Sequence, residues 1–355
     1  MQWRSGIPTV LDNLIWLILV GVFAFFVSQS PHFLTPANIT NILSAAAVLG
    51  VLVVAQTFVL ITGNFDLSIE STLGLAALFG IWLIVPELAP YWGSGLLINP
   101  FVAIAIILLM GAAIGYLIGA LITFGRMNNF IVTLAMLLIL RGSMLAFTQG
   151  NATSGLNYPD ADIFYWLGHE SAFTLPLIGK IPVAVLAMLV VFAIGHIILN
   201  HRPFGRELYA IGGNRQAAIA SGINADRRVR EVYVISGCLA AFGGWMLAGR
   251  VGSIQVNLGE GYIFTVFAAA VIGGVSLQGG RGTMLGALGG VLLLSTIDRG
   301  LNLMRVSVFW IQVIQGLIIM IAMFIDAQRI RYRIPVSVSP TSLDVVDPVT
   351  ADDRK

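Results

Sequence analysis

Long apolar runs separated by short polar connections dominate the pattern along this chain of 355 residues. A helix that crosses a bilayer needs about 20 mostly apolar residues. Ten runs approach or reach that length, and we expect each to form a helix in the membrane. The runs are 11–29, 42–62, 67–86, 100–124, 130–148, 181–200, 231–249, 262–277, 283–298 and 307–326. The predicted fold is an all-α polytopic membrane protein with about ten transmembrane helices.

Glycines lie just before one of these runs and inside another. Gly63 and Asn64 precede the third run, and Gly273 and Gly274 fall inside the eighth. Irregular backbone is tolerated at membrane depth only where protein buries it or water reaches it. We therefore expect helices that break inside the membrane or re-enter it at these two places. The number of crossings then lies between nine and eleven.

The composition requires a lipid environment. Apolar residues make up 57% of the chain and charged residues 10%, whereas soluble domains carry about 25% charged residues. A chain so poor in charge cannot cover itself with a polar surface. The single cysteine, Cys238, excludes an intrachain disulfide and a multi-cysteine metal site.

Basic residues set the expected orientation, because cytoplasmic connections carry an excess of Arg and Lys. With the N-terminus inside and ten crossings, 14 of the 19 basic residues fall on inner segments and the other five on outer ends or spans. Both termini are predicted to be cytoplasmic. Residues 1–326 are expected to form one transmembrane domain, and 327–355 a disordered cytoplasmic tail.

The connection 202–224 carries a short helix of its own. Asn214 is a favourable N-cap residue, Arg215 to Ser221 follow as a helix of about two turns, and Gly222 is a natural stop. Two turns are not stable alone in water, so this helix must dock on something. Two interpretations stay open: it docks on this chain's own helix ends, or in a groove of a soluble partner that exerts force on it.

Two carboxylates, Asp66 and Glu70, lie between apolar runs. Placing a charge at the centre of a membrane helix costs about 2.5–3.5 kcal/mol on insertion scales, so such residues are candidates for function. Asp66 also suits capping of the next helix, with the N–H groups of Ser68 or Ile69 as donors. Either a structural cap or a role on a translocation path is consistent with the sequence.

Glycines recur every four residues in two places, and these are Gly111, Gly115 and Gly119, and Gly282, Gly286 and Gly290. Each set predicts a smooth stripe on one helix face, where a second backbone can approach closely. Such stripes pack helices tightly, and they also allow two helices to slide or rock against each other.

Catalytic and nucleotide-binding motifs are absent from the sequence. The four histidines, His32, His169, His196 and His201, lie far apart, and no HExxH, GxSxG or GxxxxGK[ST] occurs. The glycine-rich stretch Gly273–Gly282 has no Lys. We expect no ATP hydrolysis by this chain, and a membrane-embedded enzyme has little support.

Three segments resemble the permease subunits of bacterial ABC importers of the ribose, xylose, galactose and autoinducer type. Residues 62–68 look like the TGGxDLS signature, and 131–142 are similar to its IVTLxxxxxxRG segment. The third segment runs from 205 to 223 and continues at 270–274 and 279–282. Asn64 departs from the usual Gly, Glu70 from a small residue, and Asn128 and Asn129 from the common proline.

The resemblance implies the permease core of an ATP-driven importer of a monosaccharide or similar small polyol. Two copies, or this chain and a paralogue, would pair with two cytoplasmic ATPase subunits and receive substrate from a periplasmic sugar-binding protein. The location is the bacterial inner membrane. ATP and Mg would be bound by the partner ATPase, and the chain itself is expected to bind no cofactor, metal or nucleic acid. Transport would proceed by rigid-body alternation between inward and outward states.

The resemblance also assigns residues to roles. The expected ATPase-coupling residues are Gly205, Glu207, Gly213, Asn214, Ala217, Ala218, Ile219 and Gly222. The expected residues of the translocation path are Asp66, Ser68, Glu70, Thr133, Gly273, Gly274 and Ser276. The alternative function is an ion-coupled secondary transporter that uses Asp66 and Glu70 together with the two helix breaks.

Overall fold

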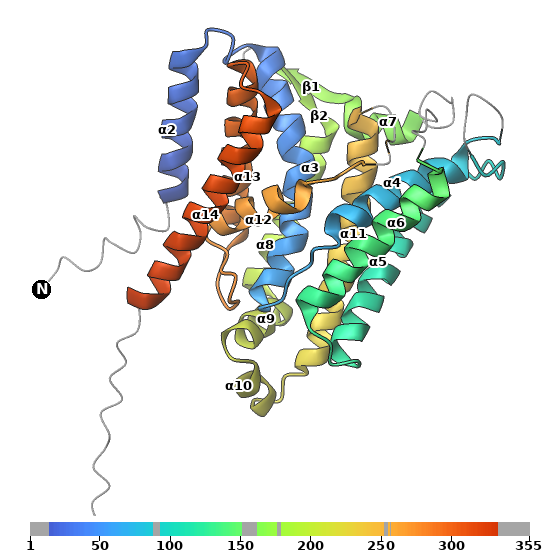
Figure 1. Cartoon of the computed structure of the whole chain (residues 1–355), viewed down its shortest axis with the longest axis vertical. Coiled ribbons are helices and arrows are strands. Elements are labelled where there is room, and N and C mark those ends of the chain that lie inside the picture. Colours follow the sequence, from blue (N-terminus) through green and yellow to red (C-terminus); the bar gives the residue numbers. More distant parts are fainter. Residues whose placement is uncertain are drawn as a thin grey trace, which may run out of the picture.

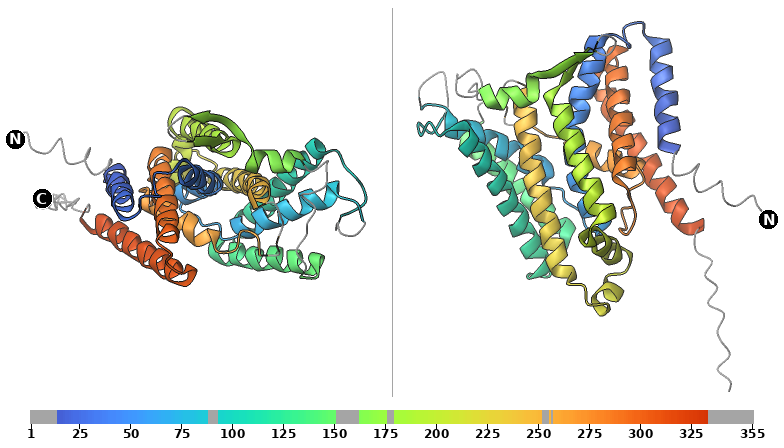
Figure 2. Two further views of the ribbon diagram at one scale, coloured as in Figure 1. Left: turned by 90° about the horizontal axis from the view of Figure 1, so that it is seen from above. Right: turned by 180° about the vertical axis from the view of Figure 1, so that it is seen from behind.

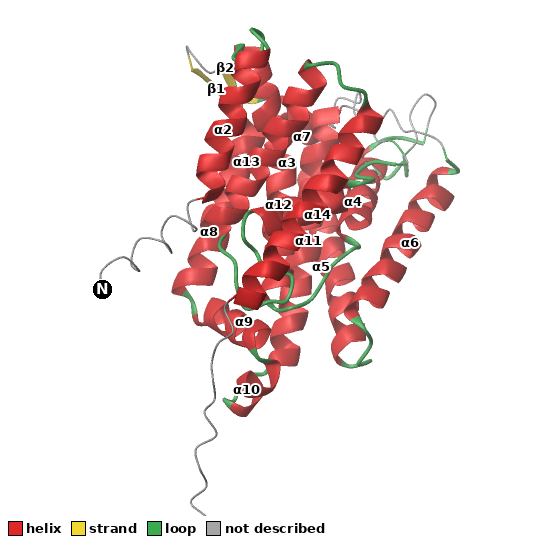
Figure 3. Cartoon of the chain, turned by 60° about the vertical axis from the view of Figure 1, so that its left-hand side comes forward, coloured by secondary structure: helices red, strands yellow, loops and turns green. Residues whose placement is uncertain are grey.

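Helices form most of the described part of the protein, as a computed structural model shows (Figure 3). The structure describes residues 14–87, 93–150, 162–175, 179–251, 255 and 257–332. Each of the ten predicted apolar runs contains the whole or the larger part of a helix or lies within one. These helices are α2 (Leu14–Gln29), α3 (Pro36–Ile61), α4 (Ile69–Ile84), α5 (Pro100–Thr123), α6 (Asn129–Thr148), α8 (Val183–His201), α11 (Ala225–Val251), α12 (Tyr262–Ile272), α13 (Met284–Leu303) and α14 (Val308–Tyr332).

The helices differ in whether they can cross a bilayer. Six are long and apolar enough to do so by length and composition, namely α3, α5, α6, α8, α11 and α13. The helices α2, α4 and α12 are apolar but shorter, and in α14 the apolar stretch is Phe309–Ile321. The polytopic architecture is therefore confirmed, and the number of ten crossings stays a prediction.

Both predicted helix breaks are present. The chain leaves α3 at Ile61 and starts α4 only at Ile69, with Gly63 at a φ of 75°. The eighth run was expected to stay helical to 277, but α12 ends at Ile272 and Gly274 takes a φ of 87°. Positive φ values of this size favour glycine, which lacks the Cβ that would clash with the backbone.

Helix α3 forms the centre of the molecule, with α2 and α14 on one side of it and α5 and α6 on the other (Figure 2). Every residue from Ala46 to Ile61 is buried, and α8, α11, α12 and α13 pack around this stretch. On the outer helices large apolar side chains are exposed instead, such as Leu109 at 69%, Leu138 at 64% and Phe309 at 79%. An apolar exterior of this kind fits lipid as the surrounding solvent.

The first glycine stripe brings α5 and α11 into backbone contact. A Cβ on Gly111 would clash with the carbonyl oxygen of Gly237, and one on Gly115 with that of Tyr233. A Cβ on Gly119 would lie 2.9 Å from the Cα of Arg230. The predicted close approach of a second helix along this stripe is therefore confirmed.

The second stripe is shorter than predicted. Gly286 and Gly290 bring α13 onto α12, where a Cβ would clash with the carbonyl oxygens of Gly273 and Ala269. Gly282 precedes the helix and takes a φ of 140°, so it is part of the preceding turn. The helix begins later because Thr283 caps it: its Oγ1 accepts the backbone N–H of Gly286 at 3.0 Å.

The prediction of an all-α fold misses a small sheet. Strands β1 (Ser171–Leu175) and β2 (Gly179–Pro182) pair antiparallel beside the short helix α7 (Asp162–His169), all between α6 and α8. The backbone carbonyl of Lys180 in β2 accepts the Thr40 hydroxyl of α3 at 2.8 Å, so the strand pair is fixed to the central helix.

The C-terminal boundary also differs from the prediction. Helix α14 continues to Tyr332, past residue 326 at which the transmembrane domain was expected to end. The rest of the predicted tail, 333–355, lies outside the described residues.

Two short helices, α9 (Pro203–Gly213) and α10 (Arg215–Ala220), lie at one end of the molecule, and the strand pair lies at the opposite end (Figure 1). The connections that follow α3, α5 and α12 reach the same end as α9 and α10, because their residues contact each other there. This grouping places three sequence motifs at a single end of the protein.

Candidate functional site at the coupling segment and the helix breaks

The segment 202–224 folds as two helices, whereas the sequence was interpreted as containing one. Helix α9 starts with Pro203 in its first turn, where the missing N–H costs nothing. Leu208 and Ile211, three residues apart, bury one face of it. Pro203 and this spacing were the signals that could have predicted α9, but the three glycines of that helix obscured them.

Helix α10 has the two ends that the sequence predicted. The Asn214 side-chain oxygen accepts the Ala217 N–H at 3.0 Å, which makes Asn214 the N-cap. Gly222 follows the helix with a φ of 86°, and the N–H of Ile223 returns to the carbonyl of Ala218 at 3.1 Å. This is the hydrogen-bond pattern of a Schellman stop, which requires the left-handed conformation at the glycine.

Helix α10 uses one face on its own chain and leaves the other free. Ala218 is buried in a small cluster with Ile211 of α9, Ile223 and Ala225. Ile219 is 53% exposed. Ala218, which was expected to contact the soluble partner, therefore docks the helix on its own chain, while the Ile219 side chain stays exposed.

Ion pairs connect α9 to the start of α11. The Arg228 guanidinium donates to the Glu207 carboxylate at 2.5 Å and to Glu231 at 2.7 Å. The hydrogen bond from Arg228 holds the pKa of Glu207 below its ordinary value of 4.5. Glu207 is thus a tie between two helices, a role that the sequence did not reveal.

Three glycine-containing segments meet at what we call the glycine junction. Its members are residues 61–63, 212–213 and 278–280. The N–H of Gly280 donates to the carbonyl of Ile61 at 2.8 Å. A Cβ on Gly212 would clash with that carbonyl and with the Gly280 nitrogen, and one on Gly279 would lie 2.7 Å from the nitrogen of Gly63. Only glycines allow three backbones to approach so closely.

The glycine junction joins the coupling segment directly to both helix breaks. Gly212 belongs to α9, while Gly63 and Gly280 belong to the breaks after α3 and after α12. The Tyr209 hydroxyl adds a second link by donating to the carbonyl of Gly282 at 2.7 Å. At the glycine junction, α9 and the two breaks are thus in direct backbone contact.

Asp66 is buried at the first break and is fully hydrogen-bonded. Its carboxylate accepts the Ser68 N–H at 3.0 Å, the Ser68 hydroxyl at 2.6 Å and the hydroxyl of Ser236 on α11 at 2.8 Å. The N-cap of α4 is Ser68. The predicted hydrogen bond from the Ser68 N–H to Asp66 is therefore present, but Asp66 lies two residues before the cap, in the turn that it attaches to α11.

Glu70 connects three helices inside the bundle. Its carboxylate lies 3.5 Å from the Arg141 guanidinium of α6 and accepts the N–H of Ile263 in α12 at 3.1 Å. Arg141 also donates to the carbonyl of Leu258 at 3.0 Å. A buried carboxylate that has lost its water needs such partners, so these contacts support a structural role for Glu70.

The remaining predicted residues of the translocation path lie in two separate parts of the structure, α6 and the second helix break. Thr133 of α6 is buried and donates to the carbonyl of Asn129 at 2.9 Å. Gly273, Gly274 and Ser276 belong to the second break. None of the seven predicted path residues lines either of the two cavities that we describe.

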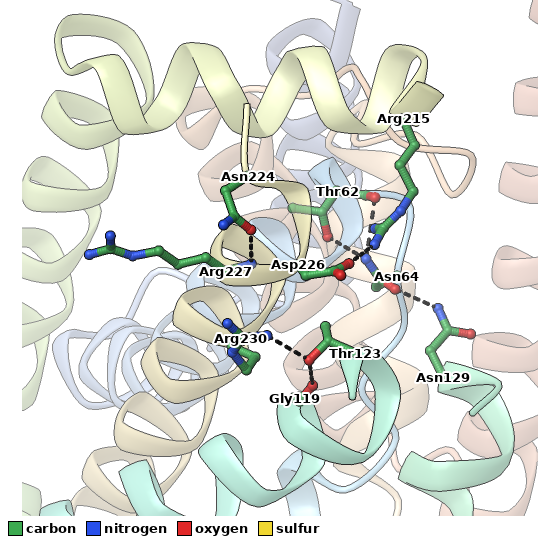
Figure 4. Close-up of polar contacts among 10 residues, drawn as sticks. All are labelled: Thr62, Asn64, Gly119, Thr123, Asn129, Arg215, Asn224, Asp226, Arg227 and Arg230. Carbon is green, nitrogen blue, oxygen red and sulfur yellow. Dashed lines mark hydrogen bonds and ion pairs between the residues drawn. The ribbon is translucent and has the colours of Figure 1, made fainter. Parts of the chain in front are cut away.

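A polar cavity of about 430 Å³ lies beside the glycine junction, and it is lined by Asn64, Ile122, Thr123, Arg126, Met127, Asn128, Asn129, Arg215 and Asp226. Asn64 is central to its contacts (Figure 4): it accepts from Asn129 at 3.0 Å and donates to the Thr62 hydroxyl at 2.8 Å. Arg215 at the start of α10 pairs with Asp226 at the start of α11. Sequence reasoning noted Asn64 and Asn129 only as departures from the family pattern, and the structure makes them partners.

No group of three His, Cys, Asp or Glu side chains in the part of the chain that the structure describes is arranged to hold a metal ion. The features that it does present are a polytopic helical bundle, two helix breaks, and a short helix with one exposed face, which α9 joins to those breaks.

Comparison with known proteins identifies the family. The chain belongs to the family described as branched-chain amino acid transport system / permease component, whose profile matches residues 38–323. The chain is thus a permease component and a non-catalytic membrane subunit, as expected.

The chain is similar to several curated permeases. It is 39% identical to the ribose import permease protein of Bacillus subtilis over 318 residues, which covers 87% of this chain and 92% of the relative. It is 34% identical to the ribose import permease protein of Escherichia coli K12 over 316 residues, or 88% and 92% of the two chains. For the galactose/methyl galactoside import permease protein of the same strain the identity is 30% over 342 residues, or 92% and 97%. No solved structure matches the chain.

Proposed function

We propose that this chain is the transmembrane subunit of an ATP-driven importer that moves a monosaccharide or similar small polyol into the cytoplasm. Its relatives are named as import permeases for ribose, galactose and xylose. The end that carries α9 and α10 is the cytoplasmic one, which places both termini in the cytoplasm after ten crossings of the inner membrane. The excess of Arg on the connections at this end supports that orientation.

The partners follow from this role. Two permease subunits, either two copies or this chain and a paralogue, pair with two cytoplasmic ATPase subunits that bind ATP and Mg. A periplasmic binding protein delivers the sugar to the opposite end. Helix α10 docks in a groove of the ATPase through its exposed face, on which Ile219 is the largest apolar side chain.

The observation that carries the mechanism is the backbone contact between Gly212 of α9 and the two helix breaks. Closure of the ATPases on ATP displaces α10, and Ala218 and the Asn214 cap transfer that displacement to α9. The glycine junction then moves both breaks together. Since packed helices shift between discrete arrangements, a small displacement at the junction suffices to change the state of the bundle.

Substitution at the exposed face of α10 tests this coupling. Ile219→Asp is expected to abolish uptake of ribose, galactose or xylose in cells that also express the ATPase and the binding protein, because the charge opposes docking in an apolar groove. Ile219→Leu keeps the apolar contact and serves as the matched control. Both proteins should reach the membrane in equal amount, since the Ile219 side chain is half exposed. Full uptake by Ile219→Asp would contradict coupling through α10.

The family match gives no support to an ion-coupled transporter. The contacts of Asp66 and Glu70 also argue against one. Glu70 is paired with Arg141 and Asp66 accepts three hydrogen bonds. A carboxylate that binds and releases an ion during transport needs free coordination sites.

A further inference from the structure

An apolar groove of about 600 Å³ opens beside α9 at the proposed cytoplasmic end, between α5, α8 and α11. Ile198 of α8, Tyr116 of α5, and Val234 and Ile235 of α11 form its wall, and Phe204 at the start of α9 closes one end. The importer mechanism proposed above does not use this groove. Its wall is suited to a hydrocarbon chain, because apolar surface at this level of the bundle is covered either by protein or by lipid.

Positive charge gathers at the mouth of the groove. Arg202, Arg227 and Arg230 line it together with a single acid, Glu231, which leaves a net charge of +2 from three bases and one acid. Arg202 is exposed and forms no ion pair within the described residues. Arg227 is paired with Glu231 at 2.9 Å but remains 68% exposed.

The other arginine of the mouth is held in place by α5. Arg230 donates to the Thr123 hydroxyl at 3.0 Å, and its guanidinium lies 4.2 Å from the centre of the Phe124 ring. Figure 4 shows that Arg227 extends away from the cluster formed by Asp226 and Asn64. Arg227 therefore lines only the apolar groove, whereas Arg230 lies between the two cavities, because its partner Thr123 lines the polar one.

We propose that this groove binds an anionic phospholipid of the cytoplasmic leaflet, with an acyl chain along the apolar wall and the phosphate at the three arginines. The proposal rests on the orientation given under the proposed function. Basic pockets between transmembrane helices on the cytoplasmic side select anionic headgroups by charge. A zwitterionic lipid makes the same apolar contacts with the wall but does not neutralise the net positive charge of the arginines. The bound lipid would hold the corner between α8 and α9 against the first turns of α11.

Native mass spectrometry of the purified full chain tests the proposal, with dioleoyl-phosphatidylglycerol and dioleoyl-phosphatidylcholine as probes. The anionic lipid is expected to bind about tenfold more tightly than the zwitterionic one. Arg202→Gln should lower the affinity for phosphatidylglycerol about fivefold and leave phosphatidylcholine unaffected. Arg206→Gln is the matched control, because Arg206 is an exposed arginine in the first turn of α9, next to Arg202, and does not line the groove. Ile198→Trp, which fills the groove, should weaken the binding of both lipids.

Four results would overturn the proposal: equal affinity for the two lipids, the same loss in the Arg202 and Arg206 variants, no effect of Ile198→Trp, or displacement of phosphatidylglycerol by inorganic phosphate. The last of these would show a site for free anions instead of a lipid. The measurement needs neither ATPase nor sugar, so its failure is distinguishable from a failure of the importer function.

Discussion

At the scale of single residues, Gly212 and Gly213 are neighbours with opposite tolerance for a side chain. A Cβ on Gly212 would clash with the Ile61 carbonyl, whereas nothing lies within 4 Å of a Cβ on Gly213. We expect Gly212→Ala to reduce sugar uptake at least about tenfold, since the shift needed at the glycine junction exceeds about 1.4 kcal/mol. Gly213→Ala should retain uptake within about twofold, because Ala stabilises a helix by roughly 1 kcal/mol over Gly.

The measurement is uptake normalised to the amount of each variant in the membrane. Equal uptake by the two alanine variants would show that the close approach of α9 to the breaks has no part in transport.

Gln56 in the middle of α3 is a second residue for which the structure predicts the effect of a substitution, here on stability. Its side chain is fully buried, and neither its amide nitrogen nor its oxygen has a partner within the described residues. An unpaired buried polar group costs about 1–3 kcal/mol. Gln56→Leu is therefore expected to raise the thermal unfolding midpoint of the purified chain in detergent.

The neighbouring residue provides the control for that measurement. Thr57 is equally buried, but its hydroxyl donates to the carbonyl of Val53 at 2.6 Å. Thr57→Val should give no comparable gain, because it removes a satisfied group. A lower midpoint for Gln56→Leu than for the unmodified chain would contradict the assignment of Gln56 as unpartnered.

Sequence was most informative for residues whose role is set by their neighbours in the chain. Asn214 and Gly222 were predicted as the ends of α10 because capping depends on local geometry. The partner of Asn64 and the unpaired state of Gln56 could not be predicted, since they depend on which helix lies opposite. Asp66 falls between the two cases: its bond to Ser68 is local, and its bond to Ser236 is not.

At the scale of elements, the tie between α9 and α11 predicts a definite pH dependence. Arg228 lowers the pKa of Glu207, so the tie stabilises the folded state above the ordinary pKa of 4.5 and is lost as pH falls through the lower folded value. We expect no loss of this tie between about pH 6 and 8. Glu207→Gln should weaken it by about 0.2–1 kcal/mol throughout that range.

Hydrogen exchange of the α9 backbone is the measurement for this tie. The expected result is faster exchange in Glu207→Gln than in the unmodified chain, with a ratio that does not change across the range. Exchange in the unmodified chain that accelerates between neutral and mildly acidic pH, after correction for the intrinsic rate, would contradict the assigned tie.

The helices themselves were largely predictable and their ends were not. All ten apolar runs are helical, because burial or lipid contact imposes that structure on the backbone. Helix α12 ends early because of Gly273 and Gly274. These two glycines were evident in the sequence, but the helix was still expected to continue to residue 277. The strand pair β1–β2 was missed because five and four residues carry too little pattern to distinguish a strand from a loop.

At the scale of the whole molecule, the sequence motifs predicted the family and the general architecture. They did not reveal why these motifs occur together in one chain. The motifs at 62–68, 205–223 and 273–282 are far apart in sequence and meet at the glycine junction. Their meeting explains why each of them carries glycine at the point of contact. Contacts of this kind arise only from packing, which spacing along the chain does not encode.

The central claim is that a separate ATPase drives this permease through α10, and the composition of the complex tests it most directly. The chain should be purified from its native membranes in a mild detergent, and the co-purifying proteins identified and quantified by mass spectrometry. We predict a P-loop ATPase in roughly equal amount to this chain, and its loss from the Ile219→Asp variant. Purification of the chain without any ATPase, repeated across several detergents, would contradict the account and leave the exposed face of α10 without a partner.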